Sequence, residues 1–287
     1  MVELENENIK VRISSKGAEL QSVFAKDRDV EYLWQGNVKY WGRRAPVLFP
    51  IVGGLKDGKY KYNGKTYTMS QHGFARDEVF ELVKADKTQA SFRLVDNERT
   101  RSNYPFQFSL LISYELVDQQ LRIAYQVQNT GKNTLLYSIG GHPAFNCPLL
   151  KEEQRSDYQL IFNHKETAHS QFLENGVRAK EGMVLNNSSR LPISDDLFDE
   201  DALIFSGLKS SQVTLSGPNG PVLDFDFSEF DYLGIWSKNS EAPFVCIEPW
   251  MGVADHALHN GDFDQKEGVR SLESNGMEEF LFSTRFF

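Results

Sequence analysis

Four polar residues stand in surroundings whose apolar, glycine or proline character does not predict them: Arg44, His72, His142 and Glu248. Imidazoles and carboxylates take and deliver protons near neutral pH, and an arginine can orient an oxygen-rich ligand through charge-assisted hydrogen bonds. Each residue also has a structural interpretation: a surface ion pair for Arg44, a buried ion pair for Glu248, and satisfied internal hydrogen bonds for the histidines. Together the four are candidates for a general acid–base site.

The neighbours of the two histidines favour a defined local geometry. His72 is followed by Gly73, which allows close backbone approach, and Arg76 adds a guanidinium four residues later. His142 follows two glycines at the end of a predicted strand, and Pro143 holds it extended.

Arg44 and Glu248 each adjoin an apolar segment. Arg44 precedes residues 45–54, one of the most apolar stretches of the chain, and Glu248 closes the apolar run 244–247 before Pro249 and Trp250. A carboxylate in such a place is expected to have either an ion-pair partner or a functional role, because an unpaired buried charge is strongly disfavoured.

The elements that position these residues are predicted to be strands, because apolar and polar residues alternate along most of the chain. Phe108 to Leu116 is the clearest example, and with Leu121 to Val127 it predicts a long antiparallel hairpin. Asn63-Gly64 suits a two-residue type I′ turn and predicts a second hairpin, with Tyr60 opposite Tyr67 and Tyr62 opposite Lys65. A third joins residues 211–215 to 221–227, and further strands are expected at 9–13, 20–24, 80–83, 91–95, 135–139, 158–162, 244–247 and 279–282.

Helical signal is scarce. Asp195 to Phe205 is the main candidate, because Ser194 could cap it and acidic residues lie near its start. The polar stretch from Lys151 to Asp201 is interpreted as a long surface excursion. With no linker and no internal repeat, the sequence predicts an all-β protein: one large antiparallel β-sandwich domain spanning residues 1–287.

Composition excludes several classes of partner. The 287 residues include 31 basic and 40 acidic side chains, a net charge of −9, so the field needed for non-specific binding to nucleic acid or an anionic membrane is lacking. The apolar run from Pro46 to Gly54 is too short for a bilayer helix, and the acidic N-terminus does not match a signal peptide. Two cysteines, Cys147 and Cys246, cannot form a disulfide framework. We therefore expect a cytoplasmic protein.

Common motifs for phosphate, dinucleotide, nucleophile or zinc-protease chemistry are absent from the sequence. Asp255, His256 and His259 have a spacing that could hold a metal on a helix. The nearby Gly252 and Gly261 favour a surface loop instead, and no third ligand motif accompanies them. No metal and no cofactor is therefore expected.

In their order along the chain, these motifs resemble the galactose mutarotase (aldose 1-epimerase) superfamily, and within it the divergent branch of LacX-like and hexose-6-phosphate mutarotase-like sequences. The resemblance covers nearly the whole chain and is carried by Arg44 through Gly54, Gln71 through Arg76, the hairpin from Phe108 to Asn129, Gly141 through Phe145, and Glu248-Pro249-Trp250. It implies a large antiparallel β-sandwich whose concave face holds a sugar, with a glutamate as general base and a histidine as general acid.

Carried over by position, the resemblance makes Glu248 the base and His142 the acid, with His72 and Arg44 binding sugar hydroxyls. The resemblance also matches Asp201 to a hydroxyl-binding aspartate of the family. Which of the two histidines is the acid stays open.

Further binding residues are Arg76, which could orient hydroxyls, and Trp250 or Trp236, which could stack on the apolar face of a sugar ring. The chain also departs from the galactose mutarotase branch. Residues 74–76 stand where that branch usually has a second glycine after the first histidine, and residues 143–145 replace its Ser-Tyr-Phe. These departures leave the identity of the sugar open.

The resulting prediction is a cofactor-independent mutarotase acting on a hexose or hexose phosphate. A non-catalytic carbohydrate-binding or sugar-sensing protein on the same fold is the alternative, and a polysaccharide lyase or hydrolase is a third that would need an extended groove. Residues 36–76 contain eight basic residues and one acidic residue, so a sugar phosphate is a candidate ligand despite the net negative charge. The expected partner is thus a small sugar or sugar phosphate, with neither nucleic acid nor membrane, and a homodimer is left open.

Overall fold

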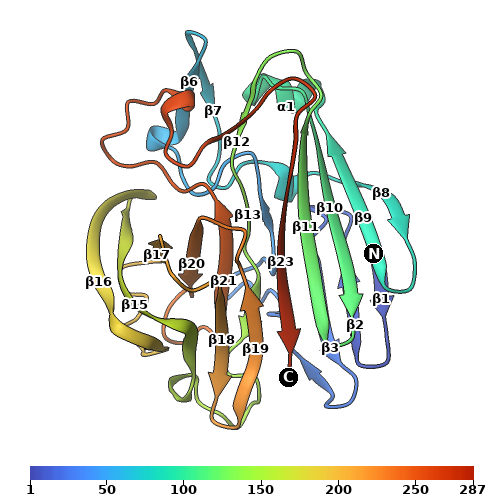
Figure 1. Cartoon of the computed structure of the whole chain (residues 1–287), viewed down its shortest axis with the longest axis vertical. Helices are drawn as coiled ribbons and strands as arrows, with labels where there is room; N and C mark the ends of the chain where they lie inside the picture. Colours follow the sequence, from blue (N-terminus) through green and yellow to red (C-terminus); the bar gives the residue numbers. More distant parts are fainter.

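The computed structural model describes residues 1–287 and consists mainly of strands, which make up 52% of the chain against 6% helix. The largest sheet has nine antiparallel strands in the order β16-β15-β18-β19-β23-β11-β10-β9-β8 (Figure 1). Their bounds are β8 (Glu81–Ala85), β9 (Gln89–Val95), β10 (Phe108–Val117), β11 (Gln120–Asn129), β15 (Gln159–Glu174), β16 (Val177–Pro192), β18 (Gln212–Gly217), β19 (Gly220–Asp226) and β23 (Met277–Phe286).

Two smaller sheets and two hairpin-sized sheets complete the strands. The first comprises β1 (Val2–Glu5), β2 (Ile9–Ile13), β3 (Leu20–Ala25) and β4 (Val30–Glu31). The second has six strands: β5 (Val47–Leu48), β13 (Ile139–Gly141), β14 (Ala144–Asn146), β17 (Leu203–Ser206), β20 (Tyr232–Trp236) and β21 (Phe244–Met251). β6 (Lys59–Tyr62) pairs with β7 (Lys65–Thr68), and β12 (Leu135–Tyr137) pairs with β22 (Arg270–Leu272).

Helical structure is limited to one α-helix and four single 3₁₀ turns. The helix is α1 (Glu98–Asn103), capped by Asn97, whose side chain accepts from the Thr100 N–H. The 3₁₀ turns are η1 (Lys56–Gly58), η2 (Ala75–Asp77), η3 (Arg155–Asp157) and η4 (Phe263–Gln265). No helix reaches the length and apolarity that crossing a membrane demands.

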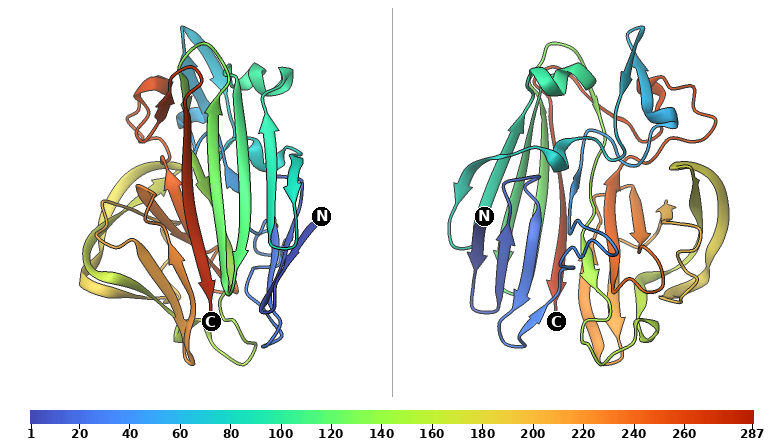
Figure 2. Two further views of the ribbon diagram at one scale, coloured as in Figure 1. Left: turned by 45° about the vertical axis from the view of Figure 1, so that its right-hand side comes forward. Right: turned by 180° about the vertical axis from the view of Figure 1, so that it is seen from behind.

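The nine-stranded sheet packs on the other two main sheets to form an antiparallel β-sandwich, which confirms the predicted fold class (Figure 2). The Tyr114 hydroxyl donates to the Ala18 carbonyl at 2.7 Å, joining β10 to the four-stranded side. On the six-stranded side, a Cβ placed on Gly141 would lie 2.8 Å from the Tyr125 hydroxyl and 3.2 Å from the Phe282 ring. β13 therefore lies directly on β11 and β23, over a core of 65 buried apolar residues.

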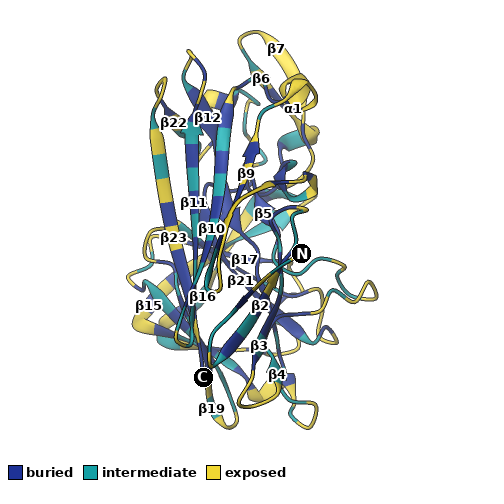
Figure 3. Ribbon diagram, turned by 90° about the vertical axis from the view of Figure 1, so that its right-hand side faces the viewer, coloured by how far each residue is buried: buried dark blue, intermediate teal, exposed yellow.

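The predicted hairpin registers are confirmed. In β10 and β11 every second residue is buried, and Figure 3 shows this alternation along both strands. Tyr60 lies opposite Tyr67 and Tyr62 opposite Lys65 across the Asn63-Gly64 turn. Local alternation and turn chemistry specify register well where a strand has one apolar face.

The expected surface excursion between Lys151 and Asp201 is wrong. β15 and β16 run for 16 residues each through this region and form one edge of the large sheet. Their pattern is hidden because three of the buried positions in β15 are Glu166, Ala168 and Ser170, and because register shifts interrupt the pairing.

The expected helix over Asp195 to Phe205 is also wrong. Residues 195–200 form hydrogen-bonded turns, and β17 begins at Leu203. The Ser194 hydroxyl does bond the Asp196 carboxylate, at 2.6 Å, but the apolar residues that follow pair with β20. Strand pairing on a buried sheet therefore overrides the local capping signal.

Candidate active site

A cavity of about 520 Å³ opens beside β17, β20 and β21, and β15 contributes Leu173 to its wall. In Figure 2, β15 and β16 curve around the outside of these short strands. Seven of the residues predicted from the sequence line the cavity: His72, Arg76, His142, Asp201, Trp236, Glu248 and Trp250. The eighth, Arg44, does not.

Glu248 and His142 form the polar centre of the cavity. Glu248 Oε2 lies 3.3 Å from His142 Nε2, and the two residues are 1% and 8% exposed. Glu248 is part of β21, whose eight residues are all buried, so its carboxylate has no route to bulk water except through the cavity. Neither Glu248 Oε2 nor His142 Nδ1 has a hydrogen-bond partner within the protein. Both groups thus keep bonding capacity for a ligand.

Burial sets the protonation of this pair. It raises the pKa of Glu248 well above its ordinary value, with a smaller contribution from the charge of Asp201. It also lowers the pKa of His142 to about 3, and the guanidinium groups of Arg76 and Arg43 act in the same direction. Near neutral pH the pair therefore holds one proton, and the form with a neutral carboxyl and a neutral imidazole is favoured. Such a pair can donate one proton and accept another at the same time.

His72 is held as a neutral hydrogen-bond donor. Its backbone is in the left-handed region, with φ of 67°, and its N–H donates to the Gly53 carbonyl at 2.9 Å. The Gly53 N–H donates to His72 Nδ1 at 3.1 Å, so the neutral ring carries its proton on Nε2. Burial lowers the pKa of His72 well below its ordinary value, with further contributions from His142 and the two arginines.

An aromatic shelf surrounds His142. The Trp41 ring stacks on the His142 imidazole with centroids 4.7 Å apart and an interplanar angle of 27°, and Trp236 meets it edge-on at 5.7 Å. Trp41 was not predicted from the sequence as a site residue, although it lies three residues before Arg44. Tyr40, next to Trp41, also lines the cavity.

The indole of Trp250 occupies space created by two glycines on the neighbouring strands. Cβ atoms on Gly234 and Gly140 would lie 2.5 Å and 2.7 Å from the Trp250 ring. Since Gly234 pairs with Glu248 and Gly140 with Trp250, these glycines allow the ring to lie flat across the sheet beside the carboxylate.

Arg44, which was predicted to bind sugar hydroxyls, does not line the cavity. Its guanidinium donates to the Gln21 side chain and to the Gln35 carbonyl, the latter at 2.9 Å, and its backbone N–H donates to Glu19. None of these three partners lines the cavity. Sequence reasoning had only the adjacency of Arg44 to an apolar segment, which does not fix the direction of the side chain.

Arg76 is the arginine that does line the cavity. It donates to the Gln71 carbonyl at 2.6 Å, while its buried Nε has no hydrogen-bond partner. Burial, reinforced by the nearby charge of Arg43, lowers the pKa of Arg76 to about 10, so it stays cationic near neutral pH. Arg43 itself pairs with Asp77 at 3.0 Å.

Three further charged residues line the cavity. Asp201 and Asp199 come from the turns before β17 and line the cavity together with Lys238. Asp201 has a φ of 73°, a conformation that aspartate tolerates better than most residues. Asp199 and Lys238 were missed because a polar loop offers no periodicity to distinguish them.

The histidine pair near Asp255 does not form a metal set. Asp255 is 2% exposed and bonds Lys266 at 2.8 Å, whereas His256 is exposed and His259 is half-buried. The three donor atoms that do cluster, within 4.8 Å of one another, belong to His142, Cys246 and Glu248. Two of these three belong to the pair described above.

Comparison with known proteins assigns the whole chain to a family. It belongs to the aldose 1-epimerase family, whose model matches residues 1–269. Protein LacX of Lactococcus lactis subsp. lactis, in its chromosomal and plasmid forms, is 37% identical over 283 residues, or 94% of each chain.

Two solved structures are similar over their full length. The galactose mutarotase related enzyme of Lactobacillus acidophilus is 37% identical with a TM-score of 0.95, covering 99% of this chain and 96% of that one. A galactose mutarotase-like protein of Lactobacillus casei is 32% identical with a TM-score of 0.93 and full coverage of both chains. The predicted superfamily is confirmed, and the family supports a carbohydrate function of the mutarotase type.

Proposed function

We propose that this protein is a mutarotase that interconverts the α and β anomers of a hexose or hexose phosphate, with Glu248 and His142 as its acid–base pair. The observation that carries the proposal is the 3.3 Å approach of Glu248 Oε2 to His142 Nε2 at the floor of the cavity. Each residue also has one buried polar atom without a hydrogen-bond partner, His142 Nδ1 and Glu248 Oε2.

The reaction needs two proton transfers in each direction. One group takes the proton from the anomeric hydroxyl while the bond between C1 and the ring oxygen breaks, and the other delivers a proton to the ring oxygen. The free aldehyde then rotates about the bond between C1 and C2, and the ring closes on the opposite face. A positioned acid or base contributes about 10²- to 10⁴-fold to such a step.

One shared proton is enough for a complete cycle. If Glu248 is ionised and His142 protonated at the start, ring opening leaves a neutral carboxyl and a neutral imidazole. Closing then uses the neutral imidazole as base and the carboxyl as acid, which restores the starting state. Because the burial of both groups favours the neutral pair, the cycle can equally start from that form, with the imidazole of His142 as base and the carboxyl of Glu248 as acid, and no outside proton is needed in either order.

The remaining lining residues fit the recognition of a sugar. The fixed Nε2–H of His72 and the guanidinium of Arg76 would donate to ring or hydroxyl oxygens, and Asp201 would accept from hydroxyls. Trp41 and Trp236 provide apolar surface beside His142, where the C–H face of a sugar ring can pack. Arg76 and Lys238 place two cationic groups in a lining that also holds Asp199 and Asp201, so a phosphorylated hexose stays among the candidates.

The test is the rate of anomer exchange, followed by NMR, for galactose, glucose and their 6-phosphates. The proposal predicts faster exchange of at least one of them than in buffer alone. Saturable binding with no acceleration of any aldose would instead select a sugar-binding protein on this fold.

A further inference from the structure

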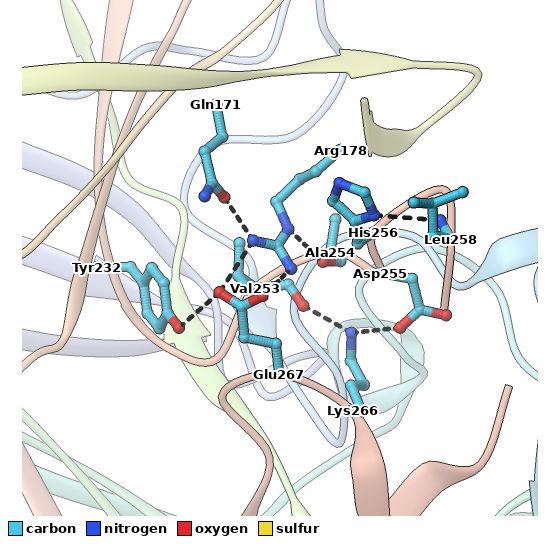
Figure 4. Close-up of polar contacts among 10 residues, drawn as sticks. All are labelled: Gln171, Arg178, Tyr232, Val253, Ala254, Asp255, His256, Leu258, Lys266 and Glu267. Atoms are coloured by element: carbon cyan, nitrogen blue, oxygen red, sulfur yellow. Dashed lines mark hydrogen bonds and ion pairs between the residues drawn. The ribbon is translucent and has the colours of Figure 1, made fainter. Parts of the chain in front are cut away.

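A network of four charged residues, three of them buried, lies next to Ala254 of the cavity lining and has no part in the proposed acid–base chemistry. Lys266 pairs with Asp255, and Arg178 pairs with Glu267 (Figure 4). The side chains of Lys266, Asp255 and Arg178 are 1%, 1% and 2% exposed. A buried ion pair contributes little net stability, because desolvation offsets most of its attraction. The groups that these four residues bind therefore indicate their role better than the ion pairs themselves.

Both cations bind consecutive carbonyls of one short loop. Lys266 Nζ donates to the Val253 carbonyl at 2.6 Å as well as to Asp255 Oδ1 at 2.8 Å. Arg178 Nε donates to the Ala254 carbonyl at 2.8 Å, while its two terminal nitrogens bond the Glu267 carboxylate at 3.0 Å and 2.6 Å. The loop is therefore held from two sides by charge-assisted bonds.

Ala254 of this loop packs against Gly53, and Gly53 is the residue that bonds His72. A Cβ placed on Gly53 would lie only 2.5 Å from the Ala254 Cβ, so Gly53 and Ala254 are packed with no spare space. Gly53 both accepts from the His72 N–H and donates to His72 Nδ1. Ala254, Gly53 and His72 all line the cavity. A displacement of the loop would therefore reach His72 through Gly53.

We propose that Lys266 and Arg178, with their partners Asp255 and Glu267, are positioning residues that hold Val253 and Ala254 against Gly53 and so fix His72 as an Nε2–H donor facing the cavity. The effect on catalysis rests on the proposed function, whereas the effect on the tautomer of His72 does not.

The test variant is Glu267→Gln. The Glu267 side chain is 53% exposed, so the protein can fold without its charge, yet Arg178 loses the anion that orients its fork. Glu278→Gln is the matched control, because Glu278 also forms a two-bond pair with an arginine, Arg270, at 2.9 Å and 2.8 Å, and lines no part of the cavity. Arg178→Lys is the second variant, since one ammonium cannot reproduce the fork.

Two readouts separate positioning from general stability. The first is the imidazole ¹⁵N spectrum of apo-protein labelled at its six histidines, with His72 assigned by a His72→Asn variant. We expect His72 to show the Nε2–H form in the wild type and in Glu278→Gln, and a mixture of tautomers in Glu267→Gln and Arg178→Lys. The second is kcat/KM for the aldose identified above, which we expect to fall about tenfold in the two network variants only.

Unchanged His72 signals in both folded network variants would overturn the inference, whatever their activity. The same holds if Glu278→Gln disturbs His72 to an equal extent. If the wild type accelerates no aldose, the proposed function fails, but the ¹⁵N comparison still decides whether the network positions His72.

Discussion

The buried pair of Glu248 and His142 makes a distinctive prediction about the pH dependence of stability. The pKa of His142 is about 3 in the folded protein, against 6.5 when unperturbed. A group whose folded pKa is depressed contributes stability that is present above its unfolded pKa and is lost as pH falls towards the folded value. For Glu248 the sign is opposite, because its folded pKa is raised and its favourable contribution is lost as pH rises above 4.5.

The two contributions oppose each other in the wild type and can be separated by substitution. In Glu248→Gln only the histidine contribution remains, so the free energy of unfolding should drop between pH 8 and pH 5. With an unfolded pKa of 6.5, the drop due to His142 over that interval is about 2 kcal/mol. In His142→Gln the carboxyl contribution remains, and stability should instead increase over the same interval.

The assay is urea unfolding followed by circular dichroism at several pH values, with the double variant Glu248→Gln, His142→Gln as the reference. The double variant retains the contribution of His72 and of every other titrating group, so these cancel in the comparison. If Glu248→Gln and the double variant have the same pH dependence, His142 titrates normally in the folded protein and the account of a buried shared proton is wrong.

Two further predictions concern residues around the pair. Arg76→Gln should lower kcat/KM for the aldose substrate by about tenfold or more, because a charge-assisted bond to the substrate is lost. Arg44→Gln should keep kcat/KM within about twofold of the wild type, because Arg44 bonds Gln21 and Gln35 outside the cavity. Equal losses in the two variants would contradict the placement of the two arginines. Trp41→Ala should raise the pKa of His142 towards its ordinary value, because the stacked indole keeps water from the ring, and an NMR titration of His142 that matched the wild type would refute this role of Trp41.

Much of the sandwich could be predicted from the sequence because its strands have one apolar face. Phe108 to Leu116 alternates strictly, and Asn63-Gly64 specifies the turn that aligns Tyr60 with Tyr67. Most of β15 was not predicted as a strand, because Glu166 and Ser170 occupy buried positions. Glu166 accepts there from the Ser210 N–H, and Ser170 accepts from the Ile204 N–H. A hydrophobic pattern cannot reveal a buried face built from polar groups.

The candidate site likewise contains residues that the sequence reveals and residues that only the fold reveals. His72, His142 and Glu248 were recognisable because each interrupts an apolar or glycine-rich context, and all three line one cavity. Arg44 lies outside the cavity lining because its side chain bonds distant partners, Gln21 and Gln35, which the sequence does not reveal. Trp41 escaped because an aromatic residue is expected in a core and only the fold places its ring on His142.

The central claim is that the Glu248–His142 pair moves protons on an aldose. The most direct measurement is the NMR rate of α-to-β exchange catalysed by the wild type, by Glu248→Gln and by the matched carboxylate variant Glu278→Gln. We predict that Glu248→Gln loses about 10²-fold or more of the catalysed rate while Glu278→Gln retains most of it. A Glu248→Gln protein that exchanges anomers as fast as the wild type would contradict the account.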